Sequence, residues 1–179
     1  MVVFLIGFMG CGKSYLGRTL AARLGWELVD MDSEIERRCG MKIAEIFERH
    51  GEEYFRERER ELLHELSERK RVVVSAGGGA PVHGDNMETM NRAGLTIYLK
   101  MSPSNLAKRL ERGMDKRPLI RDLTPGQLLA FIETRLPERE QWYARAKATV
   151  DCNGADAQYL AGHAITLIEN YDITVQKRK

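Results

Sequence analysis

The chain has 179 residues, which is enough to bury one sizeable core but short for two domains of ordinary size. Its 28 basic and 26 acidic residues leave a formal charge of +2, so no overall field favours nucleic acid or an anionic membrane as a partner. The three cysteines are widely separated and form no C-x-x-C pair, which argues against a cysteine-based metal or redox site and favours a reduced, cytoplasmic compartment.

Short apolar segments alternate with helical patterns along the chain. The first, Val2–Ile6, is too short for a signal peptide or a membrane span and predicts a buried strand. Four later segments share its β-branched character: residues 27–29, Val72–Ser75, residues 95–99 and Ala148–Asp151. This alternation predicts an α/β fold, in which helices cover both faces of a parallel sheet and ligands bind beyond the carboxyl ends of the strands.

Two helices and a polar tail are predicted between and after these strands. Leucines recur every four residues from Leu16 to Leu24 and predict a helix that ends at Gly25. A second helix, residues 53–69, mixes leucines with many Glu and Arg residues, and the balance of charge favours an amphipathic surface helix over a nucleic-acid stripe. The segment from Asp172 onward is polar and basic, which predicts a frayed end.

The strongest motif follows the first strand, where residues 7–14 read GFMGCGKS and fit the phosphate-binding pattern G-x-x-x-x-G-K-[ST]. Its glycines let backbone N–H groups converge on phosphate oxygens, and the helix that follows adds its positive end. Lys13 is expected to reach the β- and γ-phosphates, and the Ser14 hydroxyl to coordinate Mg²⁺. The nucleotide contacts are predicted at Gly10, Cys11, Gly12, Lys13, Ser14 and Tyr15.

Two carboxylates follow the second predicted strand. Alternation along the strand end places Asp30 and Asp32 on the same side, facing the phosphate site. One of them can support Mg²⁺ through water, and the other can accept a proton or a hydrogen bond from an attacking hydroxyl. The alternative is that Asp32 only caps a helix that begins near Ser33.

The opening of the chain, through GFMGCGKS and the later VDMDSEIE, resembles that of the shikimate kinases, and six ordered motifs extend this resemblance from Val2 to about Ile168. The resemblance implies a P-loop three-layer α/β/α sandwich with a five-stranded parallel sheet in the order 2-3-1-4-5 and a mobile lid. It also implies one kinase domain over residues 1–170, with a substrate-binding helical segment at about 33–62, a lid at about 112–124 and a polar basic tail at 171–179.

A first carboxylate ligand is implied by residues 51–56, GEEYFR, which resemble the family segment GExxFR. The arginine of that segment binds the substrate carboxylate, so the resemblance assigns this role to Arg56. An arginine offers a planar fork to a carboxylate, and Phe47 and Phe55 can supply apolar walls for a cyclohexene ring. Without the resemblance, Arg56 would be interpreted as one solvated charge in a helix rich in Glu and Arg.

Three glycines after the third strand, Gly77, Gly78 and Gly79, resemble the GGG segment with which the family contacts its substrate. Glycines let backbone amides approach a ligand closely. The residues before them include no acid where a Walker B carboxylate is usual, which makes Asp30 the candidate for metal support.

Two further arginines are implied on the nucleotide side. Residues 116–119, KRPL, resemble the family's RPLL lid element, so Arg117 is expected to close over ATP. Arg109 resembles the arginine that packs against adenine, although its spacing to Arg117 leaves Arg112 as an alternative. Residues 152–154 lie where the family's adenine loop is expected.

A second carboxylate ligand is implied by Arg135 and Pro137, which resemble the family segment RxPxY. The match is incomplete, because an acid and Arg139 stand where a hydrophobic residue and a tyrosine are usual, and aromatic residues follow only at Trp142 and Tyr143. Arg135 is therefore the expected ligand, and Arg139 is the alternative.

The resemblance implies a shikimate kinase that transfers the γ-phosphate of ATP, with Mg²⁺, to the 3-hydroxyl of shikimate in aromatic amino-acid biosynthesis, as a cytoplasmic monomer. Lys13, Asp32 and Arg117 are the expected catalytic residues. One rival is a kinase for another small polyol acid such as gluconate. The other is a nucleotide-binding regulator without turnover, whereas a GTP-dependent switch is disfavoured because the sequence has no N-K-x-D motif.

Overall fold

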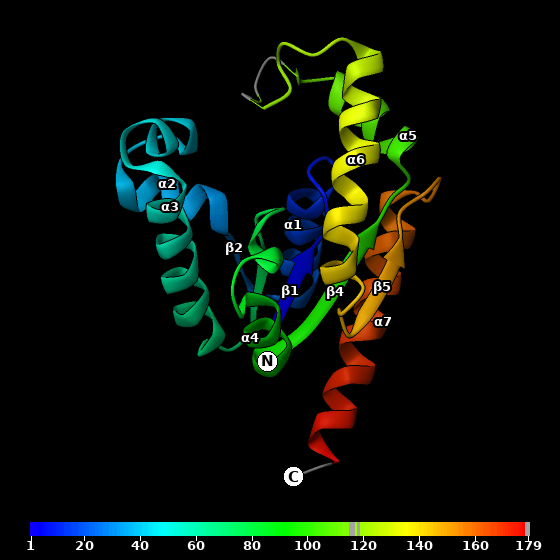
Figure 1. The fold of residues 1–179 in the computed structure, drawn as a ribbon. Coiled ribbons are helices and arrows are strands. Elements are labelled where there is room, and N and C mark those ends of the chain that lie inside the picture. The colour runs from blue at the N-terminus through cyan, green and yellow to red at the C-terminus, as the bar shows by residue number, and fades with distance from the viewer. Residues whose placement is uncertain (115–116, 118, 178–179) are drawn as a thin grey trace.

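The computed structural model describes residues 1–114, 117 and 119–177. Five strands form one parallel sheet in the order β2-β3-β1-β4-β5 (Figure 1). They are β1 (Val2–Ile6), β2 (Glu27–Asp30), β3 (Val72–Ser75), β4 (Gly94–Lys100) and β5 (Ala148–Asp151). The predicted α/β class and the expected strand order are therefore confirmed.

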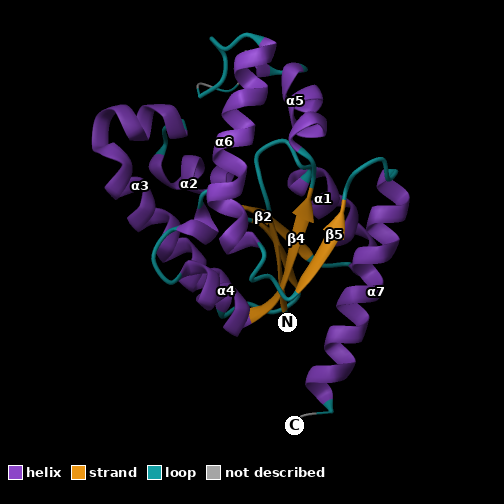
Figure 2. Cartoon of the chain, turned by 45° about the vertical axis from the view of Figure 1, so that its right-hand side comes forward, coloured by secondary structure: helices purple, strands orange, loops and turns teal. Residues whose placement is uncertain are grey.

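Helices cover both faces of this sheet, as Figure 2 shows. They are α1 (Lys13–Leu24), α2 (Met31–Cys39), α3 (Ile43–Ser67), the 3-10 turn η1 (Ala80–Val82), α4 (Asn86–Ala93), α5 (Pro103–Glu111), α6 (Pro125–Tyr143) and α7 (Ala157–Gln176). On one face α1 contacts α7, and on the other α3 contacts α4. Among the described residues, none of these helices is both long and apolar enough to cross a bilayer.

The central strand β1 forms the middle of the core. It pairs with β3 and β4, so that Val2 lies opposite both Val72 and Gly94, and all five of its residues are buried. A strand covered by helices on both faces has no solvent side, which explains why it is apolar throughout instead of alternating. This buried strand fixes the position of the loop that follows it, residues 7–12.

The two helices predicted from the sequence are present with different bounds. α1 follows the prediction: Leu16 and Leu20 are buried, and the helix ends at Gly25 in the left-handed conformation. α3 begins ten residues earlier than predicted, and Gly51, with φ 82° and ψ 173°, divides it into two helical segments. The leucine pattern showed only the second segment, because charged residues separate the few apolar positions of the first, which falls within the helical segment implied at about 33–62.

The chain remains helical where a frayed tail was predicted, because α7 continues to Gln176. Lys147 donates hydrogen bonds to the Tyr171 hydroxyl at 2.7 Å and to the Gly94 carbonyl at 2.8 Å. These bonds hold the C-terminal part of α7 against the start of β4. In the next turn, the Gln176 amide donates to Asp172 at 3.1 Å. Figure 1 shows these last turns extending past the edge of the sheet.

Candidate active site

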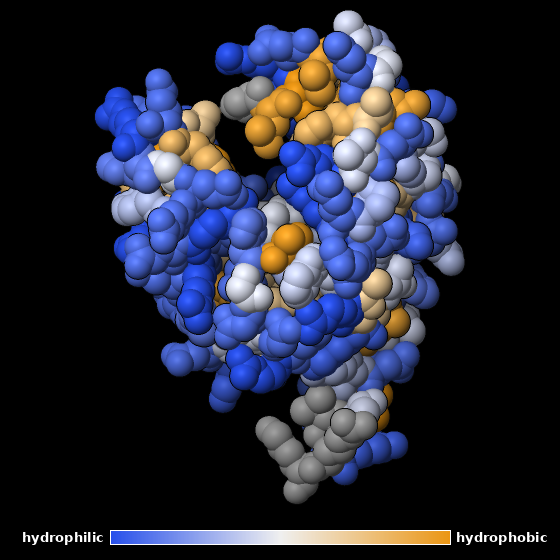
Figure 3. Space-filling view, viewed as in Figure 1, coloured by the Kyte–Doolittle hydropathy of each residue, from blue (hydrophilic) through white to orange (hydrophobic). Residues whose placement is uncertain are grey.

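The sequence motifs meet at the carboxyl ends of three adjoining strands. β1, β2 and β3 are neighbours in the sheet, and they run into residues 7–14, 30–32 and 77–79 respectively. In the view of Figure 1, the surface is hollowed between α2 and α3 on one side and α6 with its preceding loop on the other (Figure 3). This is the edge at which ligands bind to open parallel sheets.

The phosphate-binding loop closes tightly onto the N-terminus of α1. Gly12 is the N-cap, with φ 104°, a backbone conformation that side chains with a Cβ rarely adopt. The Lys13 ammonium donates to the carbonyls of Gly7 at 2.8 Å and Phe8 at 3.1 Å, so it spans the loop. An ammonium group and unpaired N–H groups at a helix start together form an anion-binding site.

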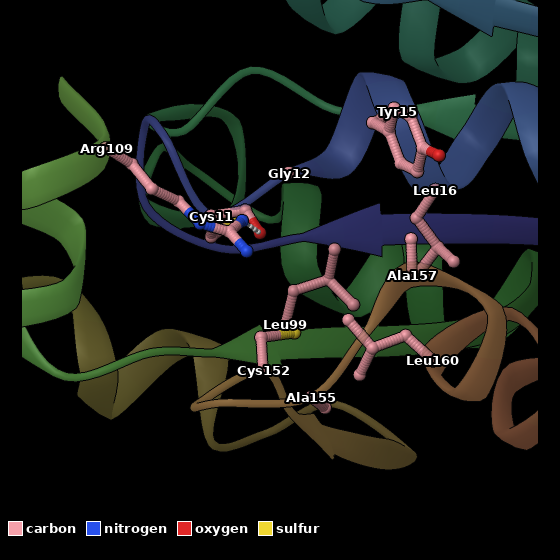
Figure 4. A pocket seen from close by; sticks show the side chains of 10 residues that line it. All are labelled: Cys11, Gly12, Tyr15, Leu16, Leu99, Arg109, Cys152, Ala155, Ala157 and Leu160. Carbon is pink, nitrogen blue, oxygen red and sulfur yellow. Dashed lines mark hydrogen bonds between the residues drawn. The ribbon is translucent and has the colours of Figure 1, made fainter. Parts of the chain in front are cut away.

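A pocket of about 260 Å³ lies beside this loop, between the start of α1 and the start of α7 (Figure 4). Its apolar walls come from Leu16, Leu99, Cys152, Ala155 and Leu160. Burial raises the pKa of the Cys152 thiol to about 12, so this wall is uncharged at neutral pH. Tyr15 lines the pocket while remaining exposed. An apolar pocket next to a phosphate cradle suits the base and ribose of a nucleotide.

Arg109 is the arginine that the structure brings to this pocket. It reaches over from α5, and its Nη1 donates to the Cys11 carbonyl at 3.3 Å. Arg112 is exposed just beyond the end of α5. Of the two arginines considered from the sequence, Arg109 therefore lies where a nucleotide base can be covered.

Ser14 and Asp30 meet beside the phosphate loop, where the Ser14 hydroxyl donates to Asp30 Oδ2 at 2.7 Å. The other oxygen of Asp30 accepts from the Ser33 N–H at 3.3 Å, which makes Asp30 the N-cap of α2. A hydroxyl and a carboxylate are hard oxygen donors of the kind Mg²⁺ prefers. Within the described residues no cluster of three or more His, Cys, Asp or Glu side chains could hold a metal.

Asp32 reaches the site from a helix instead of a strand end, so the alternation argument was wrong. β2 ends at Asp30 and α2 begins at Met31, which places Asp32 in the first turn of α2 and leaves the capping role to Asp30. A Cβ atom on Gly77 would lie 2.7 Å from Asp32 Oδ1. Burial, with a further contribution from Asp30, raises the pKa of Asp32 above its usual range.

Arg56 is held in place by two glutamates. Its Nε and Nη2 donate to Glu52 at 3.1 and 3.0 Å, and its Nη1 donates to Glu59 at 2.9 Å. The guanidinium carbon lies 5.1 Å from the centre of the Phe55 ring. A Cβ on Gly79 would lie 3.0 Å from both Nη1 and Nη2, so any larger residue would press on the outer end of this fork.

Glu59 is a site residue that the sequence prediction missed. Its side chain is 1% exposed, and burial raises its pKa to about 7, although Arg56 lowers it. A Cβ on Gly77 would lie 3.1 Å from Glu59 Oε1, so the carboxyls of Glu59 and Asp32 flank the same glycine. The available signal was an acid on the apolar face that Phe55 and Leu62 define, where a charged side chain needs a partner.

The second arginine at the site is Arg139, and the expectation for Arg135 was wrong as to position. The Arg135 side chain is 55% exposed and pairs with Glu138 at 3.1 Å on the outside of α6. The guanidinium of Arg139 lies 5.3 Å from the centre of the Phe8 ring, and its Nη1 would be 3.5 Å from a Cβ on Gly78. The structure therefore brings Arg56 and Arg139 to two consecutive residues of the glycine segment, Gly79 and Gly78.

Tyr143 fixes α6 to the glycine segment one helical turn after Arg139. It is fully buried, and its hydroxyl donates to the Gly78 carbonyl at 2.5 Å. Its ring packs against Tyr98, with ring centres 5.2 Å apart. Burial raises the pKa of Tyr143, so the phenol is protonated and acts as a donor at neutral pH. The tyrosine expected from the resemblance is thus present, but at a later position than Pro137 suggested.

Arg117 belongs to the segment that was expected to act as a lid. Its Nη1 donates to the carbonyl of Gly113 at 2.8 Å, within the loop that joins α5 to α6. Lys116 and Pro118, its neighbours in the expected lid element, lie outside the described residues. The contacts that the structure describes for Arg117 are therefore with its own loop.

The cleft contains two neighbouring binding sites, which meet at the glycine segment. The ammonium of Lys13 and the start of α1 form an anion cradle beside an apolar pocket. On the other side, two guanidinium groups and the carboxyl of Asp32 face Gly77, Gly78 and Gly79. The first arrangement suits a nucleoside triphosphate, and the second suits a small acid that carries hydroxyl groups.

Comparison with known proteins gives one consistent result. The profile of the shikimate kinase family matches residues 9–169. A shikimate kinase from Parabacteroides distasonis is 46% identical over 149 residues, which cover 83% of this chain and 86% of that relative. The crystal structure of a shikimate kinase from Bacteroides thetaiotaomicron matches with a TM-score of 0.90 at 36% identity, covering 94% of this chain and 98% of that one. A shikimate kinase from Acinetobacter baumannii, solved in complex with shikimate, matches with a TM-score of 0.81 at 38% identity, covering 94% and 93%.

Proposed function

The chain belongs to the shikimate kinase family, and from this premise we propose that it transfers the γ-phosphoryl group of ATP to the 3-hydroxyl of shikimate. The products are ADP and shikimate 3-phosphate. The observation that carries the proposal is the convergence on Gly77–79 of two guanidinium groups and one carboxyl, directly beside a phosphate loop. Shikimate is a carboxylic acid with ring hydroxyls, so this set matches both kinds of group.

On the nucleotide side, the phosphates lie against the backbone N–H groups of residues 10–15, and the base occupies the pocket under Arg109. The ammonium of Lys13 exchanges its contacts with loop carbonyls for phosphate oxygens. Bound Mg²⁺ would neutralise charge on the phosphate oxygens, with Ser14 and Asp30 as its protein-side support. Arg117 adds a further positive charge when its loop closes over the site.

On the acceptor side, Arg56 and Arg139 bind the carboxylate of shikimate. Glu52 and Glu59 occupy three donor positions of Arg56, which leaves the outer edge of its fork, beside Gly79, for the substrate. Two arginines fix both the position and the orientation of a planar carboxylate. The ring hydroxyls are then directed toward Asp32 and the phosphate loop.

Asp32 is the group that accepts the proton of the attacking hydroxyl. Its raised pKa moves it closer to neutral pH, where a carboxylate is a more effective proton acceptor than an ordinary aspartate. The nearby carboxyl of Glu59 holds Arg56 and adds negative charge beside Asp32 when it is ionised. Positioning and charge neutralisation supply the rest of the catalysis, as in other phosphoryl transfers.

The deciding experiment is a coupled assay of ADP release with MgATP, in which shikimate, gluconate and other small polyol acids are compared with no acceptor. ADP release that requires shikimate is the expected result. Release with another acid alone would retain the kinase and reject the acceptor. If no acceptor supports ADP release, although ATP binds, the chain is a nucleotide-binding regulator.

We also infer the arrangement that the family implies: one kinase domain over residues 1–170, with residues 33–62 as the acceptor-binding segment and 112–124 as the lid. A cytoplasmic monomer is consistent with this arrangement, since one chain supplies both halves of the cleft and all three of its cysteines, each within the described part, are free thiols. Light scattering at micromolar concentration tests the monomer, and a mass near 20.4 kDa is expected.

A further inference from the structure

Each of the two arginines at the acceptor site lies over a phenylalanine ring. Arg56 lies over Phe55, its neighbour in α3, with 5.1 Å between the guanidinium carbon and the ring centre. Arg139 lies over Phe8 at 5.3 Å, and Phe8 belongs to the phosphate-binding loop. The acceptor side is therefore built in part by a residue of the nucleotide side.

Phe8 serves the two sides with different atoms. Its carbonyl accepts hydrogen bonds from the Lys13 ammonium at 3.1 Å and from the Cys11 N–H at 3.3 Å, so its backbone is part of the phosphate loop. Its side chain is 1% exposed and forms the apolar surface beneath Arg139. A ring that is excluded from water attracts a guanidinium more strongly than an exposed one.

The guanidinium of Arg139 has two neighbours that can hold it, the Phe8 ring and the hydroxyl of Tyr143. A Cβ on Gly78 would lie 3.5 Å from Arg139 Nη1 and equally close to the Gly7 carbonyl and the Met9 N–H, so the missing side chain lets the guanidinium approach the loop. Within residues 1–114, 117 and 119–177, no acidic side chain pairs with Arg139 within 4 Å. By contrast, two glutamates hold Arg56.

We propose that Phe8 is a positioning residue for the acceptor: its ring holds the guanidinium of Arg139 in the orientation that binds the substrate carboxylate. This inference rests on the proposed function, because it needs a carboxylate at Arg139. A long side chain without an ion-pair partner samples several rotamers, and a fixed aromatic face reduces that freedom before the substrate arrives. The phosphate loop thus contributes to acceptor affinity through a side chain that touches neither substrate.

The test replaces the aromatic face while it keeps the residue apolar. Phe8→Leu is expected to raise the KM for shikimate about 3- to 30-fold, a larger factor than any change in kcat or in the KM for ATP. Phe4→Leu is the matched control, since Phe4 is equally buried in β1 and does not lie under Arg139. A general loss of packing would affect both variants alike, and equal effects would overturn the inference.

A second measurement separates the ring face from its volume. Mono-, di- and trifluorinated phenylalanine at position 8 keep the shape of the ring and weaken the negative charge of its face stepwise. The dissociation constant for shikimate, measured by calorimetry, is expected to rise with each fluorine, and a flat series would overturn the inference.

The Arg139→Ala background distinguishes this inference from the proposed function. In that background, Phe8→Leu is expected to have no further effect on shikimate affinity, because the group that it positions is gone. A full additional effect would overturn the role of Phe8 while the kinase assignment stands. A wild-type chain that neither binds nor phosphorylates shikimate would overturn the proposed function itself.

Discussion

Glu59 is nearly excluded from water, and the pKa of its carboxyl is raised from 4.5 to about 7 by burial. Between these pH values the folded protein binds more protons than the unfolded chain, so the contribution of Glu59 to stability is fully present below about pH 4.5 and is lost as the pH rises to 7. Glu59→Gln removes this titration and keeps the shape of the side chain. The unfolding free energy of the variant relative to wild type is therefore expected to increase across this window, by as much as about 3 kcal/mol.

Urea unfolding at pH 5 and pH 8 measures this difference. Glu61→Gln is the control, because Glu61 lies on the same helix with its side chain 54% exposed, and its difference from wild type is expected to be the same at both pH values. A pH-independent difference for Glu59→Gln would show that the buried carboxyl does not titrate in this range.

Arg135 and Arg139 make a matched pair for testing the acceptor site. Arg139→Ala is expected to raise the KM for shikimate about 10- to 100-fold, since it removes hydrogen bonds to a charged carboxylate. Arg135→Ala removes only an exposed pair with Glu138 and is expected to change that KM less than 2-fold. Initial rates at saturating MgATP measure both values. The opposite ranking would restore Arg135 as the ligand.

Asp32→Asn tests the proton acceptor. The amide keeps the size of the side chain but cannot take the proton, so kcat is expected to fall about 10²- to 10⁴-fold. Binding of a non-hydrolysable ATP analogue, measured by calorimetry, is expected to stay within about 3-fold, because Asp32 lies on the acceptor side of the loop. Normal turnover in this variant would remove Asp32 from the mechanism.

At this scale the sequence predicted residues that lie together in the chain better than residues brought together by packing. Gly10 to Tyr15 form one continuous motif, so their place at the turn between β1 and α1 is local. Arg135, Arg139 and Tyr143 are spaced by four and share one stripe of α6, and each step along that stripe is about 6 Å. Which residue of this stripe faces Gly78 depends on how α6 packs against the sheet, and no local sequence pattern encodes that packing.

Among the elements, α3 depends on a backbone conformation that only glycine adopts easily. Gly51 interrupts the helix with φ 82° and ψ 173°, which lets one segment carry Phe47 and the other carry Phe55, with ring centres 5.0 Å apart. In Gly51→Ala the added Cβ would have no atom within 4 Å, so only backbone strain opposes it. This strain is expected to lower the unfolding free energy by about 1–3 kcal/mol.

Gly162→Ala is the control for Gly51→Ala. Gly162 lies inside α7, also with no atom near its Cβ position, and alanine there is expected to stabilise the protein by about 0.5–1 kcal/mol. Chemical denaturation of both variants gives the two values. If the two variants changed the unfolding free energy equally, the break in α3 would not depend on a backbone conformation that favours glycine.

Strands were easier to predict than helix ends. β1, β3 and β5 have the predicted bounds because each is a short β-branched run enclosed by turns. α2 begins at Met31, immediately after β2, because Asp30 caps it; the alternative considered for Asp32 placed the cap two residues later. Since Asp30 and Asp32 both suit a cap, only the hydrogen bond to Ser33 decides between them.

For the whole molecule, ligand binding is expected to appear as thermal stabilisation. A non-hydrolysable ATP analogue with Mg²⁺ at 100 times its dissociation constant adds about 2.7 kcal/mol, which for a domain of this size raises Tm by about 5–11 °C. Chelation of the metal is expected to reduce this shift, and Ser14→Ala is expected to make it nearly insensitive to the chelator. A shift that the chelator leaves unchanged in wild type would reject Ser14 and Asp30 as the metal support.

The pairing of β1 has a consequence for how the chain is made. Val2 lies opposite Val72 and Gly94, so both neighbours of β1 leave the ribosome long after it does. Until β4 has emerged at Lys100, the run VVFLI is an apolar strand with an unpaired edge. Such a segment attracts chaperones or other nascent chains. Slow translation between residues 7 and 100 would therefore prolong its exposure, and the yield of folded protein should depend on codon speed in that stretch.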